Sequence, residues 1–362
     1  MNELPPPAIV SPARVEAALV WQQLPSLPAG SAVAGAFAGT IGGRLIIAGG
    51  AAFPDGKTRT FVDRIHALTQ RPHDSFAWSD RTSQLPRPAG YGATIPWQDG
   101  LILAGGCDAD ACFSEVFLLG PDLKPARTLA PLPLPLAHMA FARVGSTLVV
   151  AGGQSTPSGP ALARAFALDL GSEPAVWQEL PAWPGPGRTA AVGVGLGGEF
   201  FLLGGRQVEG GRPTVPLTDA YALDLATRTW RRLADVGTPA EPPASVMAAT
   251  AVGLDGDRFV VLGGGAADFL VRREALERDL VAARVSGSSP AIVAAQARLD
   301  ALPHPGFQRA LRVYDRRTGR WQRLPDMPFA HPPVTTTAVR WDDLIVLPAG
   351  EIRPRTRTDE IW

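Results

Sequence analysis

Acidic and basic side chains gather near the C-terminus, in the segment PAGEIRPRTRTDEIW. It holds a glutamate shortly before three alternate arginines: Glu351, Arg353, Arg355 and Arg357. A nearby guanidinium keeps a carboxylate ionised, which suits it to act as a base, and can itself bind a substrate carboxylate in a bidentate manner. The alternative interpretation is a cluster of Glu and Arg in a surface loop.

The other reactive residue types do not form a metal or nucleotide motif. The segment GVGLGG, residues 193–198, has the glycine spacing of a dinucleotide-binding loop, but a strand-like segment follows where that motif requires a helix. The histidines are not spaced as metal ligands, and Cys107 and Cys112 are too few for a four-ligand site. We therefore expect no metal, no cofactor, and free thiols rather than a local disulfide.

Charge and hydropathy argue against several classes of function. The 34 basic and 34 acidic residues cancel, which disfavours a nucleic-acid partner or a polybasic membrane surface. No apolar stretch is long enough to span a bilayer, and the first residues, MNELPPPAIV, do not resemble a signal peptide. These features predict a soluble cytoplasmic protein, or a periplasmic one if a leader has been removed.

Internal repeats predict the elements that must position these side chains. An apolar run ending in small residues occurs six times, in LIIAGG, LILAGG, LVVAGG, FFLLGG, FVVLGG and LIVLPAG. All but the last spacing are roughly 50 residues, a period that is typical of propellers. Most repeats also carry a later strand with Trp, which we expect to pack between adjacent blades. Short apolar strands bounded by Gly and Pro at this period predict an all-β fold, a six-bladed β-propeller.

The two ends and one insertion depart from the repeat. Residues 21–25, WQQLP, precede the first repeat, whereas the last repeat lacks its own Trp-containing strand. We therefore expect an N-terminal strand to complete the sixth blade and close the ring. Residues 266–303 have helical composition and interrupt the fifth blade, either as a decoration or as a lid or wall of a site. The expected division is an N-terminal extension, residues 1–20, and a single propeller, residues 21–362.

The geometry expected of a propeller adds candidate binding residues. The residues that follow the Trp strand of a blade lie on the same face as the ends of the inner strands, and that face opens on the central channel. This placement nominates Tyr91, His138, Arg188 and His331, and Arg206 joins them because it follows the fourth Gly-Gly pair. Each of them has an alternative role in a loop or in packing.

Several segments together resemble the cyclically permuted mutarotase family, kelch-repeat relatives of bacterial N-acetylneuraminate epimerase. They include VAGAFAGTIGGRLIIAGGAAFPDG, YGATIPWQDGLILAGG, WQELPAWPGPGRTAAV, LPHPGF and the terminal PAGEIRPRTRTDEIW. The resemblance covers about residues 21–362 and implies a kelch-type propeller. Two features depart from the relatives: the catalytic repeat is last rather than central, and Ala52 stands before Phe53 where relatives commonly have Asn.

The resemblance implies an isomerase that interconverts the α and β anomers of N-acetylneuraminate or a related sialic acid by general acid-base ring opening. It implies Glu351 as the catalytic base and Arg357 as the anchor of the sugar acid carboxylate. The Pro-Gly-x-x-Arg context also suggests Arg188 as a pocket residue. The general acid, the exact sugar and a homodimer are left open. The alternative is a non-catalytic kelch propeller that binds a protein partner or a carbohydrate.

Overall fold

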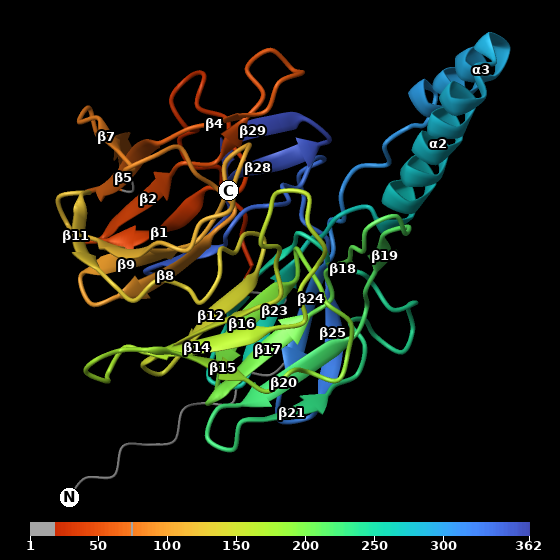
Figure 1. Ribbon diagram of the computed structural model, residues 1–362. Coiled ribbons are helices and arrows are strands. Elements are labelled where there is room, and N and C mark those ends of the chain that lie inside the picture. Colours follow the sequence, from red (N-terminus) through yellow and green to blue (C-terminus); the bar gives the residue numbers. More distant parts are fainter. Residues whose placement is uncertain (1–18, 74) are drawn as a thin grey trace, which may run out of the picture.

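Antiparallel sheets make up most of the chain, and they are arranged as a β-propeller (Figure 1). The computed structural model describes residues 19–73 and 75–362, so the extension that we expected at residues 1–20 lies almost wholly outside the described residues. Five sheets in the described part contain at least four strands, and each sheet is built from one continuous stretch of sequence. The propeller arrangement and the all-β class agree with the prediction from the repeats.

The five sheets follow one another along the chain. The first contains β1 (Phe37–Ile41), β2 (Arg44–Ala48), β5 (Arg64–Arg71), β6 (Ser75–Trp78) and β7 (Ser83–Gln84). The second contains β8 (Ala93–Trp97), β9 (Gly100–Ala104), β10 (Val116–Leu119) and β11 (Pro125–Thr128). The third contains β12 (Ala140–Val144), β13 (Thr147–Ala151), β14 (Ala165–Asp169) and β15 (Trp177–Leu180). The fourth contains β16 (Val192–Leu196), β17 (Glu199–Leu203), β20 (Ala220–Asp224) and β21 (Thr229–Arg232). The fifth contains β22 (Thr250–Gly253), β23 (Arg258–Leu262), β24 (Leu311–Asp315) and β25 (Arg320–Leu324).

Shorter strand pairs and two helices complete the described elements. The pairs are β3 (Ala51–Ala52) with β4 (Thr60–Phe61), β18 (Arg206–Gln207) with β19 (Val215–Pro216), β26 (Val339–Trp341) with β27 (Leu344–Val346), and β28 (Pro348–Arg353) with β29 (Thr356–Ile361). The helices are α2 (Ala267–Ser286) and α3 (Ser289–Asp300), which lie between β23 and β24 in sequence. Neither helix combines the length and the apolar character needed to cross a membrane.

Helices α2 and α3 form a hairpin that projects away from the sheets (Figure 1). Helix α2 ends because Gly287 adopts the left-handed conformation, with φ of 68°. Helix α3 then begins with a proline in its first turn, where no intrahelical N–H is needed. Strands β23 and β24 pair directly at the base of the hairpin, so the insertion leaves the fifth sheet unbroken.

Tryptophan side chains fill most of the seams between sheets. In four sheets the outermost strands carry an indole whose Nε1 donates to a backbone carbonyl of the preceding segment of the ring, at 2.7 to 3.3 Å. The pairs are Trp78 with Ser26, Trp177 with Ala130, Trp230 with Pro181 and Trp321 with Ala234. Each of these four indoles is therefore both packed and hydrogen-bonded.

A closed ring of backbone hydrogen bonds joins six separate segments. Each member donates its N–H to the carbonyl of the previous one, and Gly35 donates to Thr335, all at 2.6 to 2.9 Å. The members are Gly35, Tyr91, His138, Ala190, Ala248 and Thr335, and all have positive φ. This conformation is strained for every residue type except glycine, and the ring of hydrogen bonds offsets the strain. Glycine is needed at position 35 because a Cβ there would lie 2.3 Å from the ring of Tyr91.

The last repeat differs from the five regular sheets. Strands β26 and β27 pair only with each other, and the chain continues through a backbone pair between Leu347 and Trp362. Beyond it the register shifts between Pro348 and Gly350, and Pro348 has no N–H to donate to a ladder. Six equal four-stranded blades, which we expected, are therefore not present as such. Five sheets are regular, and the sixth repeat is divided into shorter pairs.

The first described residues lie beside the C-terminal strand. The N–H of Leu24 donates to the carbonyl of Ile361, and the N–H of Leu27 donates to that of Asp359, both at 2.8 Å. The side chains of Leu24 and Leu27 are buried in the same apolar cluster as Ile361. The two ends of the described chain are thus joined by both backbone bonds and core packing.

Candidate active site

A pocket of about 460 Å³ opens against the backbone ring. Five of the six ring members contribute to its lining, and Gly35 is the exception. The β28–β29 hairpin, the β3 and β18 segments and the base of the α2–α3 hairpin supply most of the rest. Its volume falls in the range of small-molecule sites in proteins.

Glu351 and Arg357 lie opposite each other in the β28–β29 hairpin and both line the pocket. Glu351 Oε1 is 2.8 Å from Arg357 Nη1, with the side chains 21% and 5% exposed, respectively. Only a short turn around Pro354 separates β28 from β29. Residues that are six positions apart in the sequence therefore face each other across the hairpin. Figure 1 shows this hairpin at the end of the chain, against the β3–β4 region.

The neighbours of the pair hold both side chains in place. Arg357 Nε donates to the carbonyl of Ala51 at 3.2 Å, and its guanidinium carbon lies 4.8 Å from the ring centre of Phe53. Glu351 Oε1 also accepts the backbone N–H of Arg355 at 3.0 Å. A buried arginine that is stacked and hydrogen-bonded in this way presents its remaining N–H groups in a fixed direction.

Tyr91 and His138 form part of the pocket lining, with ring centres 4.4 Å apart. Burial raises the pKa of Tyr91, so its phenol stays protonated at neutral pH. Burial also lowers the pKa of His138 to about 3, and the charges of Arg206 and Arg59 act in the same direction. His138 is therefore neutral at pH 7. Behind Tyr91 lies an apolar cluster that includes Cys107 and Cys112, both buried free thiols.

Arg206 brings a second guanidinium to the pocket, from the start of β18. Burial lowers its pKa, while the charges of Glu274 and Glu351 oppose this shift. Its Nε is buried and has no hydrogen-bond partner among the described residues. An unpartnered buried donor is costly to leave unsatisfied, so this group is suited to receive a ligand oxygen.

The helical insertion supplies one wall of the pocket, which the sequence left open as an alternative to a decoration. Phe269, Arg273 and Glu274 from the first turns of α2 line the pocket. Glu274 Oε2 accepts the backbone N–H of Thr214 at 3.0 Å, which ties the base of the hairpin to the segment before β19.

A histidine in the segment after α3 also lines the pocket and was not among our candidates. The ring of His304 lies between those of Phe269 and Phe307, at 4.5 and 4.9 Å between centres. Its Nε2 is buried and has no hydrogen-bond partner in the described part of the chain. The segment LPHPGF, which carries part of the family resemblance, contains this histidine and was the signal that could have nominated it.

Two of the predicted binding residues lie outside the pocket. Arg188 is fully buried and makes two 2.9 Å hydrogen bonds to the carboxylate of Asp219, so its two terminal nitrogens are used inside the protein. His331 is exposed and its Nε2 lies 3.5 Å from Arg353. Neither lines the pocket, and we remove both from the candidate set. The structure brings together the other five: Tyr91, His138, Arg206, Glu351 and Arg357.

The charge of the lining favours an anion. It contains five arginines and three glutamates, which gives a positive balance in a partly enclosed space. Two of these guanidinium groups, those of Arg206 and Arg357, are buried in the protein rather than exposed to solvent. The lining thus combines a carboxylate that can act as a base with guanidinium, phenol and imidazole groups that can donate hydrogen bonds. Such a set of groups can perform acid-base chemistry on a polar, negatively charged molecule.

Comparison with known proteins gives a family match over most of the chain. The family described as N-acetylneuraminate epimerase matches residues 130–362. The chain is similar to N-acetylneuraminate epimerase of Yersinia pestis (strain Pestoides F), with 28% identity over 64% of this chain and 56% of that protein. It is also similar to Adagio-like protein 3 of Oryza sativa subsp. japonica, with 33% identity over 50% of this chain and 30% of that protein. The matches therefore span from about a third to about half the length of these curated relatives.

A solved structure shares the fold. The structure of YjhT aligns with a TM-score of 0.65 and 14% identity, covering 92% of this chain and 95% of that one. The alignment includes the region before residue 130 that the family match leaves out. At this identity the likeness concerns the fold of the chain.

Proposed function

Because the chain belongs to the N-acetylneuraminate epimerase family, we propose that it is a mutarotase that interconverts the α and β anomers of N-acetylneuraminate or a related sialic acid. The observation that carries this proposal is the pair of Glu351 and Arg357, joined at 2.8 Å in a pocket with a positive balance of charge. In a sialic acid the carboxylate and the anomeric hydroxyl are bonded to the same carbon. A base and a carboxylate anchor must therefore be neighbours, as these two side chains are.

In the proposed reaction Glu351 removes the proton of the anomeric hydroxyl. The bond between the anomeric carbon and the ring oxygen then breaks, the ring oxygen takes up a proton, and the open-chain keto acid forms. Rotation about the bond next to the carbonyl exposes its other face, and the reverse steps close the ring as the opposite anomer. Arg357 holds the carboxylate throughout, so the open chain stays in the pocket.

The remaining lining residues orient the sugar. Arg206 offers an unpartnered Nε–H, while the protonated phenol of Tyr91 donates and neutral His138 can donate or accept. Each of these groups lies on or beside the rigid backbone ring, so little ordering is needed when the substrate binds.

Glu351→Gln tests the assignment of the base. We expect exchange between the two anomers of N-acetylneuraminate, followed by NMR, to slow by about 10²- to 10⁴-fold because general base catalysis is lost.

Arg357→Ala in the same assay should chiefly raise KM for the sugar acid, since it removes the group that anchors the carboxylate. Glu277→Gln is the matched control because Glu277 lines the pocket and pairs with Arg273 rather than with Arg357.

Full exchange activity in folded Glu351→Gln would refute the assigned base. Binding of the sugar acid by the wild-type chain without faster exchange would instead favour the non-catalytic alternative. Circular dichroism and thermal unfolding of each variant establish that the fold is kept.

We also propose that residues 21–362 form one six-bladed propeller, in which the broken last repeat and the segment around Leu24 make the sixth blade. The ring of six backbone hydrogen bonds, with one member from each repeat, supports this count. The backbone bonds from Leu24 and Leu27 to β29 support closure by the N-terminal segment.

A further inference from the structure

The outer strand of the second sheet, which faces the seam with the first sheet, lacks the tryptophan that the outer strands of the other four regular sheets carry. In each of those four sheets the Trp of the outer strand pairs with the equivalent residue of the neighbouring third strand. The pairs are Leu68 with Trp78, Leu168 with Trp177, Leu223 with Trp230 and Tyr314 with Trp321. The corresponding position in the second sheet is Leu119, because it also pairs with the second residue of its inner strand. Its partner on β11 is Pro125.

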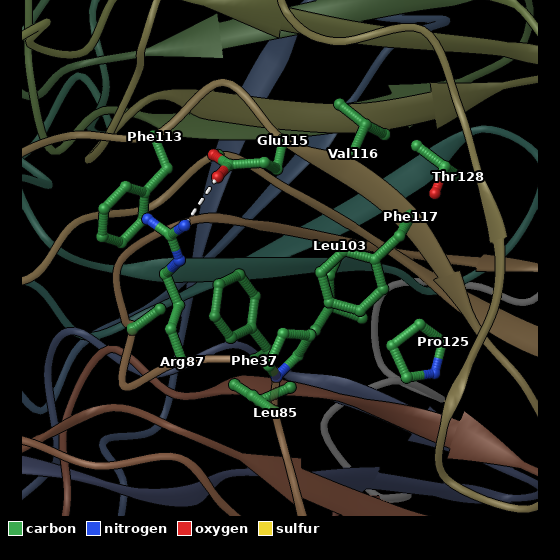
Figure 2. A pocket seen from close by; sticks show the side chains of 13 residues that line it. Phe37, Leu85, Arg87, Leu103, Phe113, Glu115, Val116, Phe117, Pro125 and Thr128 are labelled. Atoms are coloured by element: carbon green, nitrogen blue, oxygen red, sulfur yellow. Dashed lines mark ion pairs between the residues drawn. The ribbon is translucent and has the colours of Figure 1, made fainter.

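A cavity of about 210 Å³ lies in this seam, with Pro125 in its lining. Aromatic and aliphatic side chains from both sheets form its walls, and Figure 2 shows them around the central space: Phe37, Leu85, Leu103, Phe113 and Phe117. The first four are 8% exposed or less, so the walls belong to the protein core. Engineered apolar cavities of about 150 Å³ stay dry and bind benzene, so this space is large enough for a planar aromatic ligand.

An exposed ion pair lines the polar edge of the cavity. Arg87 Nη2 lies 3.1 Å from Glu115 Oε1, and both side chains are about half exposed (Figure 2). The guanidinium of Arg87 also stacks over Phe113, with 4.6 Å between its carbon and the ring centre. An exposed ion pair contributes little to stability, so its opening costs the protein little.

We propose that this cavity is a binding site for a small, neutral, planar aromatic molecule of the indole class. The ligand takes the place that an indole side chain occupies in the other four seams, between aromatic walls that favour stacked or edge-to-face contacts. The site is separate from the pocket around Glu351, since the two share no lining residue. It does not depend on the proposed reaction.

Indole itself is the probe, added to the full-length protein and observed by ligand-detected saturation-transfer NMR. We expect saturable binding with a dissociation constant on the order of 0.1 to 1 mM, as for a ligand of this size. Pro125→Trp should place an indole side chain in the cavity from the exposed strand β11 and weaken indole binding at least tenfold. Thr128→Phe fills the cavity from the rim, and it supplies a second variant in case the first does not fold (Figure 2).

Pro121→Trp is the matched control, because Pro121 is exposed on the turn before β11 and does not line the cavity. Its affinity for indole should stay within twofold of the wild type. The proposal is overturned if indole shows no saturable binding, or if folded Pro125→Trp and Thr128→Phe bind it as the wild type does. Loss of indole binding when N-acetylneuraminate is present in excess would place the probe in the other pocket and overturn the proposal as well.

Discussion

Three arginines of the same sequence take different roles because their partners differ. Arg357 faces Glu351 across one hairpin, Arg206 brings an unpartnered Nε to the pocket lining, and Arg188 donates from both terminal nitrogens to Asp219 outside the pocket. The sequence could predict the first pairing because the two residues are local and their strands adjoin. It could not predict the last, because the carboxylate that binds Arg188 is 31 positions away and belongs to another strand.

The pH dependence of stability tests the environment of His138. Its pKa is lowered to about 3 by burial, so between about pH 3 and the ordinary value of 6.5 the unfolded chain binds a proton that the folded chain does not. Stability should therefore fall as the pH falls through this window. At pH 4.5 this residue should account for about 2–3 kcal/mol of the loss relative to pH 7.5.

His138→Gln should remove that part of the slope, whereas the exposed His73 provides a control in His73→Gln. The measurement is the free energy of unfolding in urea at both pH values. Parallel curves for the wild type and His138→Gln would show that burial at this position does not hold the imidazole neutral.

Strands could be predicted from the sequence more completely than the walls of the site. The apolar runs that end in Gly-Gly correspond to β2, β9, β13, β17 and β23, each the second strand of its sheet along the chain, because alternation and glycine punctuation are local signals. Helical composition likewise indicated the insertion now seen as α2 and α3. That the first turns of α2 face the pocket depends on how the hairpin leaves the fifth sheet, and no local pattern encodes this.

Two ion pairs between elements provide a matched comparison of burial. Arg188 and Asp219 join the segment before β16 to the start of β20, with side chains 0% and 14% exposed. Arg164 and Glu179 make a similar two-bonded pair, but 45% and 53% exposed. Arg188→Ala leaves the partly buried carboxylate of Asp219 without its ion-pair partner, with only the Tyr221 hydroxyl among the described side chains still donating to it, and should lower the free energy of unfolding by about 3–5 kcal/mol.

Arg164→Ala, the exposed counterpart, should cost about 0–1 kcal/mol. Chemical unfolding of the two variants gives both numbers directly, and KM for the sugar acid in folded Arg188→Ala should match that of the wild type. Equal losses of stability in the two variants would contradict a structural role that depends on burial, and a raised KM would return Arg188 to the binding residues.

At the scale of the molecule, the backbone ring links the fold to the pocket. Its six members come from segments spread between residues 35 and 335, and five of them line the pocket. Each of the six repeats recognised in the sequence supplies one of these segments, which supports the proposed count of six blades. We expected a regular sixth blade although Pro-Ala-Gly is visible in the sequence, and it is in this segment that the register of β28 shifts and the last repeat becomes irregular.

The proposed closure of the molecule by its N-terminal segment leads to the last prediction. Leu24 is 5% exposed, packs in the cluster that contains Ile361 and donates its N–H to that residue, whereas Val20, four positions earlier, is 89% exposed. Leu24→Ala removes buried apolar contacts at the junction of the two chain ends and should lower the free energy of unfolding by about 2–4 kcal/mol. Val20→Ala, which deletes apolar atoms from the same segment without a buried contact, should change it by less than about 0.5 kcal/mol. Because a closed ring unfolds as one unit, Leu24→Ala should shift the whole thermal transition to lower temperature, including the signal of tryptophans in distant seams. A transition that keeps its midpoint, or a separate early phase limited to the last repeat, would show that the N-terminal segment rests on the propeller without closing it.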